Sequence, residues 1–247
     1  MLFVAEPYEG DRVSLDAASQ GAALLRASDQ TLLVSFGDEI TREAHQRVLA
    51  LVASLQTAPI AGTLNLHPAY CSLLIKFDLR RTTHEAVERA VRDRMARADV
   101  AAVPARRQVE IPVCYGGDFG PDLTALAGLR RLSVEDLIRI HSQTAYTVYF
   151  LGFVPGFAYL GTLPEAIAAP RLPSPRRRVE AGSVAIAGRQ TGIYPCPVPG
   201  GWQLIGRTPL SMFRTDRDPM ALLACGDEVR FRPIGREEFA RIEKGGA

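Results

Sequence analysis

The hydrophobic positions of the first hundred residues alternate between two periods. Residues 22–36 (AALLRASDQTLLVSF) form two short alternating runs about a Ser-Asp turn, which predicts two strands. From 41 to 56 the period becomes helical, with Thr41 as the predicted N-cap. Two further strand-like runs, GTLNLHPAY and SLLIKFD, precede a second amphipathic helix in THEAVERAVRDRMARAD. The predicted order is β-β-α-β-β-α.

The pattern changes after DVAAVPAR, a stretch of small residues broken by proline that is typical of a linker. A strand in RQVEIPV and two short helices follow, the second with Ser133 as N-cap and Asp136 at the capping-box position. Strands and turns then alternate through YTVYFLGF, GSVAIAG, GGWQLIGRT and DEVRFRPI, which predicts a β-barrel or sandwich. The predicted division is an N-terminal extension (1–21), an α/β domain (22–103), a barrel domain (104–236) and a charged tail (237–247).

Composition narrows the function classes. A formal charge of +2, from 29 basic and 27 acidic residues, favours neither nucleic acid nor an anionic membrane as partner. The uncharged run 142–164 is long enough for a membrane span, but Gly152, Pro155, Gly156 and Gly161 interrupt it. Four widely spaced cysteines predict no metal site and no disulfide framework, and the start lacks a secretory signal. We expect a cytoplasmic protein.

No motif names a reaction unaided: G-x-x-x-x-G-K-[ST], G-x-S-x-G, H-E-x-x-H and G-x-G-x-x-G are all missing from the sequence. GFVPGFAYLG instead places Phe153, Phe157 and Tyr159 around a Pro155-Gly156 turn. Aromatic side chains here are either core residues or the wall of a ligand pocket, and the spacing leaves both open.

Polar and glycine-rich loops follow the aromatic segment. PRLPSPRRRVEAG holds four arginines, which form either a solvated basic loop or a carboxylate or phosphate site. AGRQTGIYP and PGGW are predicted turns whose glycines allow backbone donors to approach a ligand. They would form a ligand site if they converged at one mouth of the barrel. His141 ends a predicted helix, where the helix C-terminus favours the protonated ring, and the alternative is a capping or core histidine.

Four motifs together carry a family likeness: IPVCYGGDFGPDL, YFLGFVPGFAYLG, LPSPRRRVEAGSVAIAGRQTGIYP and PGGWQLIGRTPLSMF. Over residues 28–234 the chain resembles the family of the 5-oxoprolinase B subunit (PxpB), which includes the histidine-kinase inhibitor KipI and allophanate hydrolase subunit 1. The resemblance implies an α+β fold of two domains, a small ferredoxin-like α/β domain followed by a cyclophilin-like β-barrel.

The resemblance also implies an activity and partners. Such a protein acts with subunits C and A to hydrolyse 5-oxoproline to L-glutamate with ATP, and this chain is expected to be inactive alone. A stable cyclic amide needs its carbonyl activated before water opens the ring, which fits an ATP-dependent assembly. Three alternatives remain: a KipI-like inhibitor of a sensor kinase, an allophanate- or urea-type amide hydrolase or carboxyltransferase component, and, by barrel analogy alone, a prolyl isomerase.

The family motifs imply site residues. His141 and Gln190 are the expected catalytic pair, facing one cleft, and Arg178 is expected to bind the substrate carboxylate. The remaining substrate-binding residues are expected to be Phe153, Pro155, Gly156, Phe157, Tyr159, Thr191, Tyr194, Gly200 and Trp202. The chain departs from the family pattern in about twenty extra N-terminal residues, Arg189 in place of glycine, and His67 and Cys71 in the PAYxSLL region.

Overall fold

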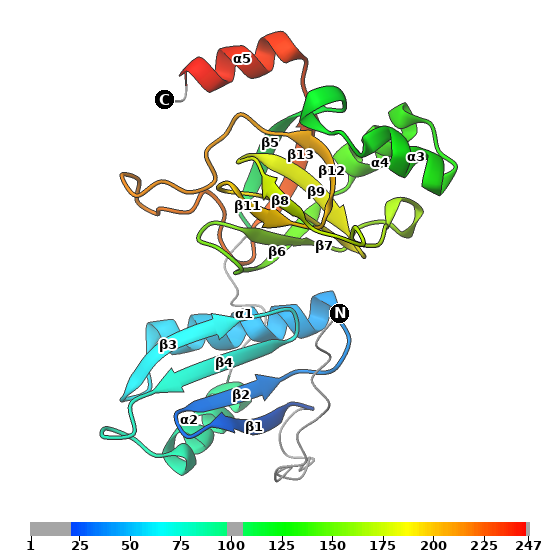
Figure 1. Cartoon of the computed structure of the whole chain (residues 1–247). Helices are drawn as coiled ribbons and strands as arrows, with labels where there is room; N and C mark the ends of the chain where they lie inside the picture. Colours follow the sequence, from blue (N-terminus) through cyan, green and yellow to red (C-terminus); the bar gives the residue numbers. More distant parts are fainter. Residues whose placement is uncertain (1–20, 98–105, 246–247) are drawn as a thin grey trace. The chain divides into compact units, whose positions relative to one another are not determined.

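The computed structural model describes residues 21–97 and 106–245. The chain divides into two compact units, Met1–Pro104 and Ala105–Ala247 (Figure 1). The boundary predicted near residue 103 and all but the last residue of the predicted N-terminal extension lie outside the described residues.

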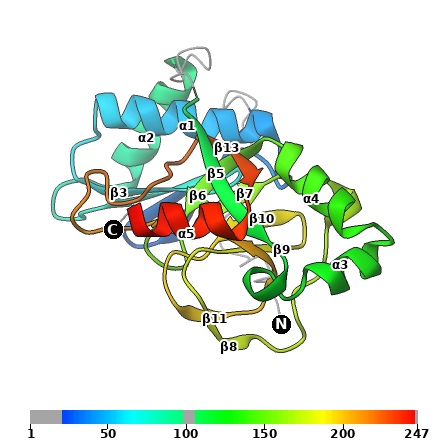
Figure 2. The same ribbon diagram turned by 90° about the horizontal axis from the view of Figure 1, so that it is seen from above.

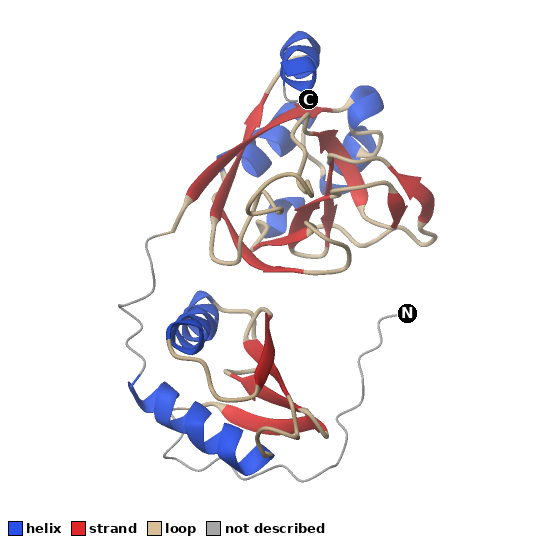
Figure 3. Ribbon diagram, turned by 90° about the vertical axis from the view of Figure 1, so that its left-hand side faces the viewer, coloured by secondary structure: helices blue, strands red, loops and turns tan. Residues whose placement is uncertain are grey.

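The N-terminal unit is a four-stranded antiparallel sheet with two helices. The sheet order is β1-β2-β4-β3, and Figure 3 shows both helices on the same face of it. The elements are β1 (Ala23–Ser28), β2 (Thr31–Ser35), α1 (Arg42–Thr57), β3 (Thr63–Pro68), β4 (Ser72–Phe77) and α2 (His84–Arg97). The predicted element order is confirmed, and Thr41 caps α1 by accepting a hydrogen bond from the Ala44 amide at 3.1 Å.

The C-terminal unit is built on a closed seven-stranded barrel of order β10-β7-β6-β13-β5-β12-β9. Only the β5–β13 pair is parallel. The strands are β5 (Gln108–Tyr115), β6 (Tyr146–Leu151), β7 (Ala158–Gly161), β9 (Ser183–Ala187), β10 (Gln190–Ile193), β12 (Gln203–Arg207) and β13 (Glu228–Pro233). Because β9 and β10 pair with each other, the barrel closes and its strands have no free edge.

Helices and a small hairpin complete this unit. Helices α3 (Leu123–Arg130) and α4 (Val134–Gln143) connect β5 to β6 in the sequence. They lie beside each other, as Figure 2 shows. Ser133 caps α4 as predicted, since its hydroxyl accepts from the Asp136 amide at 3.0 Å. The 3₁₀ turns are η3 (Gly117–Phe119) and η4 (Glu165–Ile167), and β8 (Arg176–Val179) pairs with β11 (Val198–Gly200).

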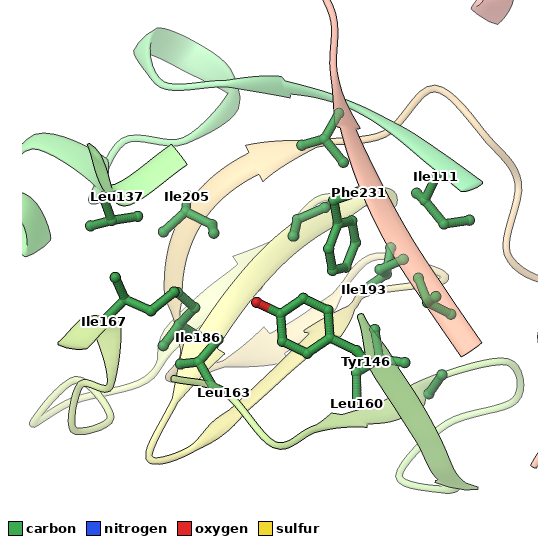
Figure 4. Close-up of a cluster of buried hydrophobic side chains, with 14 of the residues drawn as sticks. Ile111, Leu137, Tyr146, Leu160, Leu163, Ile167, Ile186, Ile193, Ile205 and Phe231 are labelled. Carbon is green, nitrogen blue, oxygen red and sulfur yellow. The ribbon is translucent and has the colours of Figure 1, made fainter. Parts of the chain in front are cut away.

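The barrel has apolar layers on both its inner and outer faces. Along β9, Val184 and Ile186 belong to the interior cluster, whereas Ala185 and Ala187 belong to a second cluster outside it. This alternation follows from the two-residue period of a strand. Figure 4 shows the interior, where aliphatic side chains surround Tyr146 and Phe231.

Several short elements differ from the predictions. The predicted charged tail is helix α5 (Arg236–Gly245), because Phe239 gives it a buried contact with Phe119, at 4.6 Å between ring centroids. Strands β7, β8, β10 and β11 occupy segments predicted as loops. In the described part of the chain, no helix combines the length and apolar character that crossing a bilayer requires.

Candidate functional site

His141 lies at the centre of a buried chain of hydrogen bonds inside the barrel. Its Nε2 is 3.0 Å from Thr191 Oγ1, and its Nδ1 is 2.8 Å from the Tyr115 hydroxyl. Thr191 donates its one hydroxyl hydrogen to the Ala185 carbonyl at 3.0 Å, so the Thr191 oxygen accepts from His141 Nε2–H. Nδ1 then accepts from Tyr115. Every polar atom of this neutral imidazole is satisfied within the core.

The surroundings of His141 oppose its protonation. Complete burial lowers the pKa of His141 to about 3, and burial raises the pKa of Tyr115 well above its ordinary value. The ring stacks on Phe231 with centroids 4.5 Å apart. The expectation that the helix C-terminus favours the charged form is therefore wrong, because desolvation in the core outweighs the helix dipole.

On the outer face of the barrel, five rings form what we call the aromatic cluster: Phe153, Phe157, Tyr159, Tyr194 and Trp202. Phe157 is at its centre, with edge-to-face contacts to the other four at centroid distances of 4.9 to 5.6 Å. Phe157, Tyr194 and Trp202 are buried, Tyr159 is half-buried and Phe153 is 58% exposed. The cluster therefore has a packed base and an accessible edge made by Phe153 and Tyr159.

Strand pairing brings the cluster together across 50 positions of sequence. Gly192 of β10 pairs with Tyr159 of β7, and a Cβ at position 192 would lie 3.0 Å from Phe157 Cζ and 3.2 Å from Trp202 Cζ3. The Tyr194 hydroxyl likewise lies against Gly200, where any side chain would collide with it. Two of the glycines thus leave room for the rings.

The loop between β6 and β7 holds Phe153 in an uncommon conformation. Phe153 has φ +68°, and Gly156 has φ +82° at the turn that Phe213 packs against. Pro155 is exposed between them. A positive φ is unfavourable for an aromatic residue, so the surrounding structure must enforce this conformation. Residues held in such conformations cluster at ligand and partner sites.

The arginines of the proline-rich segment have different environments. Arg176 donates to Asp122 at 2.6 Å, and Asp122 also accepts from the Leu204 amide at 2.6 Å, so this pair fastens β8 to β12. Arg178 is exposed and donates to Glu180 at 2.6 Å. Arg189, the departure from the family pattern, is exposed and 3.6 Å from Glu165.

The structure separates the two expected catalytic residues. Thr191 points into the barrel toward His141, so the preceding residue, Gln190, projects from the opposite face of β10. Gln190 is half-buried there, in phase with Gly192 and the aromatic cluster. The prediction that His141 and Gln190 face one cleft is therefore wrong, because adjacent residues of a strand alternate in direction.

Two residues near these groups were missed by sequence reasoning. Tyr115 ends β5 and completes the His141 chain, and Asp122 accepts the bonds that hold β8 and β12. Both lie in the family motif IPVCYGGDFGPDL, which is the sequence signal that could have found them. Among residues 21–97 and 106–245, no group of three or more His, Cys, Asp or Glu is placed to hold a metal ion.

These observations define a class of protein: mixed α/β chains with a four-stranded sheet unit and a closed seven-stranded barrel that carries an aromatic cluster on its outer face. Residues 22–223 match the model of the family described as "Carboxyltransferase domain, subdomain C and D". The chain belongs to that family.

Named relatives are similar over much of the chain. It is 43% identical to the 5-oxoprolinase B subunit of Bacillus subtilis over 221 residues, covering 85% of this chain and 92% of the relative. It is 54% identical to the 5-oxoprolinase B subunit of Escherichia coli O157:H7 over 133 residues, covering 54% of this chain and 61% of the relative. The crystal structure of TTHA0988 matches with a TM-score of 0.75 and 39% identity, over 83% of this chain. This chain spans 40% of the length of TTHA0988.

Proposed function

We propose that this chain is the B subunit of an ATP-dependent 5-oxoprolinase, which converts 5-oxoproline, ATP and water to L-glutamate, ADP and phosphate in the cytoplasm. The observation that carries the proposal is the 43% identity with the Bacillus subtilis protein of that name over 92% of its length. In this proposal the N-terminal unit is a ferredoxin-like domain and the C-terminal unit a cyclophilin-like barrel, joined near residue 104.

The aromatic cluster is the proposed substrate surface. Its accessible edge offers Phe153 and Tyr159 for apolar contact with a small ring, and Gln190 on the same face of the barrel offers an amide to the lactam. Phe157, Tyr194 and Trp202 form the rigid base that holds this edge in place. His141 and Thr191 hold β10 from inside the barrel, since all their hydrogen bonds go to other core groups.

The proposed reaction needs further subunits besides this chain. Water does not readily open a stable lactam, so the carbonyl oxygen must first be activated, and the sequence carries none of the nucleotide-binding motifs that would bring ATP to this chain. We therefore assign ATP to the assembly with subunits C and A and expect the isolated chain to be inactive. Within the assembly, this chain would present the substrate ring in a fixed orientation.

Reconstitution tests this function. The purified chain is combined with subunits C and A, and ADP and glutamate are measured with and without 5-oxoproline. We expect ADP and glutamate to form in equal amounts, only when all three proteins and 5-oxoproline are present. An assembled complex without 5-oxoproline-dependent turnover would contradict the proposal. Inhibition of a sensor kinase by the chain, or turnover of allophanate, would then favour the corresponding alternative.

A further inference from the structure

Arg171 occupies a fixed position beside the aromatic cluster. The carbonyl of Pro170 accepts a hydrogen bond from Gln203 Nε2 at 3.1 Å, and the Leu172 amide donates to the Gly201 carbonyl at 2.7 Å. The residues on either side of Arg171 are therefore tied to the segment that carries Trp202. These bonds place the Arg171 backbone at the rim of the cluster.

The charge of Arg171 acts on two members of the cluster. Burial raises the pKa of Tyr159 and of Tyr194, and the positive charge of Arg171 opposes the shift in both. The guanidinium thus lies within electrostatic range of both phenol groups. An exposed aromatic edge and a cation face the same region.

Arg171 differs from Arg176 and Arg178 in having no anion to pair with. Arg176 donates to Asp122 and Arg178 to Glu180. Arg171 is exposed and, within residues 21–97 and 106–245, has no hydrogen bond or ion pair with a carboxylate. An arginine held by its backbone beside apolar rings, with its donors unused, is arranged to receive a carboxylate from outside the chain.

We propose that Arg171 and the accessible edge of the aromatic cluster form a binding site for a small cyclic carboxylate. The carboxylate pairs with the Arg171 guanidinium, and the ring packs on Phe153 and Tyr159. This inference deepens the proposed function and rests on it for the identity of the ligand, 5-oxoproline. It assigns carboxylate recognition to Arg171 in place of Arg178, whose guanidinium is already held by Glu180.

Two ligands that differ only in the carboxylate test this site on the full chain. L-5-Oxoproline and 2-pyrrolidinone have the same lactam ring, and the second lacks the carboxylate. Calorimetric titration should show tighter binding of 5-oxoproline to the wild type. Arg171→Gln should weaken that binding by roughly 10- to 100-fold, the usual effect of losing a charged hydrogen-bonded pair, and leave 2-pyrrolidinone unchanged.

Arg230→Gln is the matched control. Arg230 is an exposed arginine of β13, which in the barrel order is separated from β10 by β7 and β6 and from β9 by β5 and β12. Its replacement removes the same charge and should leave both affinities unchanged. An equal loss in Arg230→Gln would reduce the effect to net charge, and a loss in Arg178→Gln with none in Arg171→Gln would overturn the assignment.

A second readout separates this inference from the proposed function. In the reconstituted assembly, Arg171→Gln should raise KM for 5-oxoproline by roughly 10- to 100-fold, with kcat changed much less. An active assembly whose KM is indifferent to Arg171 would overturn the carboxylate site and leave the function standing. Arg171-dependent binding of 5-oxoproline in an assembly that hydrolyses no ATP would support the carboxylate site and overturn the proposed function.

Discussion

The two faces of β10 differ in whether the polar groups near their aromatic rings have hydrogen-bond partners within the chain. On the inner face, Thr191 and His141 complete each other's hydrogen bonds, and both are fully buried. On the outer face, the aromatic cluster lies beside Arg171, a cation with no carboxylate partner in the described part of the chain. The comparison teaches that a polar residue in a family motif need not bind the ligand: His141 and Thr191 match such positions, yet they bond to each other in the core. What decides is whether its hydrogen-bonding groups are already satisfied.

The largest test of this comparison is His141→Ala. It empties a cavity in the barrel and leaves the Tyr115 and Thr191 hydroxyls without their partner. We expect a loss of roughly 3 to 5 kcal/mol in the free energy of unfolding, measured with denaturant. His141→Ala with wild-type stability but no activity in the assembly would show that the histidine is catalytic after all.

The pH dependence of stability sharpens the same point. The folded pKa of His141 is about 3, below its ordinary value of 6.5, so between these values the unfolded chain binds a proton that the folded chain does not. The contribution of neutral His141 to the free energy of unfolding is complete above pH 6.5. It is lost as the pH falls toward 3, by up to about 1.4 kcal/mol per pH unit.

The measurement is the difference between wild type and His141→Gln in urea unfolding from pH 7 to pH 4. Tyr115 does not titrate in this window, since burial raises its pKa. We expect the wild type to lose more stability than the variant as the pH falls. Parallel curves would mean that His141 is solvated enough to protonate in the folded protein.

The neighbours Thr191 and Gln190 allow a direct comparison of the two faces. Thr191→Val should cost about 1 to 3 kcal/mol, because His141 Nε2–H loses its acceptor, and Thr191→Ser should recover most of this. Gln190→Ala should cost less stability than Thr191→Val, because Gln190 is half-buried on the outer face and not enclosed in the core. In the assembly, Gln190→Ala should lower kcat by about 10²- to 10³-fold, the usual effect of removing an amide donor from a developing charge. A large stability loss in Gln190→Ala, with a loss of kcat but not of stability in Thr191→Val, would place the structural role on the outer face and the functional role on the inner face.

The sequence predicts much of the fold because long periodic segments carry their own signal. The N-terminal element order, α3, α4 and both predicted N-caps are confirmed, as are the longer barrel strands. The four missed strands, β7, β8, β10 and β11, have three or four residues each, among glycines and prolines, and are too short to show a period. Helix α5 had a signal, the apolar pair Phe239 and Ile242 at i, i+3 spacing, which its charged residues obscured.

The candidate site could be predicted only in part. Family motifs pointed to Phe157, Tyr194 and Trp202, and the structure brings these rings together through the pairing of β7 with β10. The motifs could not show that Thr191 and Gln190 point in opposite directions, since that depends on which residue of β10 faces the interior. Nor could they separate Arg171 from Arg178, because a carboxylate partner such as Glu180 is defined by geometry.

The smallest expected change in stability is at the exposed edge of the aromatic cluster. Phe153 is 58% exposed at φ +68°, so Phe153→Ala removes little buried area and keeps the strained backbone. We expect the free energy of unfolding to stay within about 0.5 kcal/mol of wild type. Phe153→Gly is the backbone control and should be more stable than the alanine variant by about 1 kcal/mol, because glycine adopts positive φ without strain.

Both Phe153 variants should bind 5-oxoproline more weakly than the wild type, because each lacks the ring that the ligand packs on. Calorimetric titration of the two variants against the wild type measures this, with urea unfolding of the same samples. If the glycine variant binds as the wild type does, the ring has no part in the site, and the strained backbone serves only the turn before β7. If the alanine variant loses several kcal/mol, Phe153 belongs to the packed base with Phe157, and the accessible edge of the cluster reduces to Tyr159.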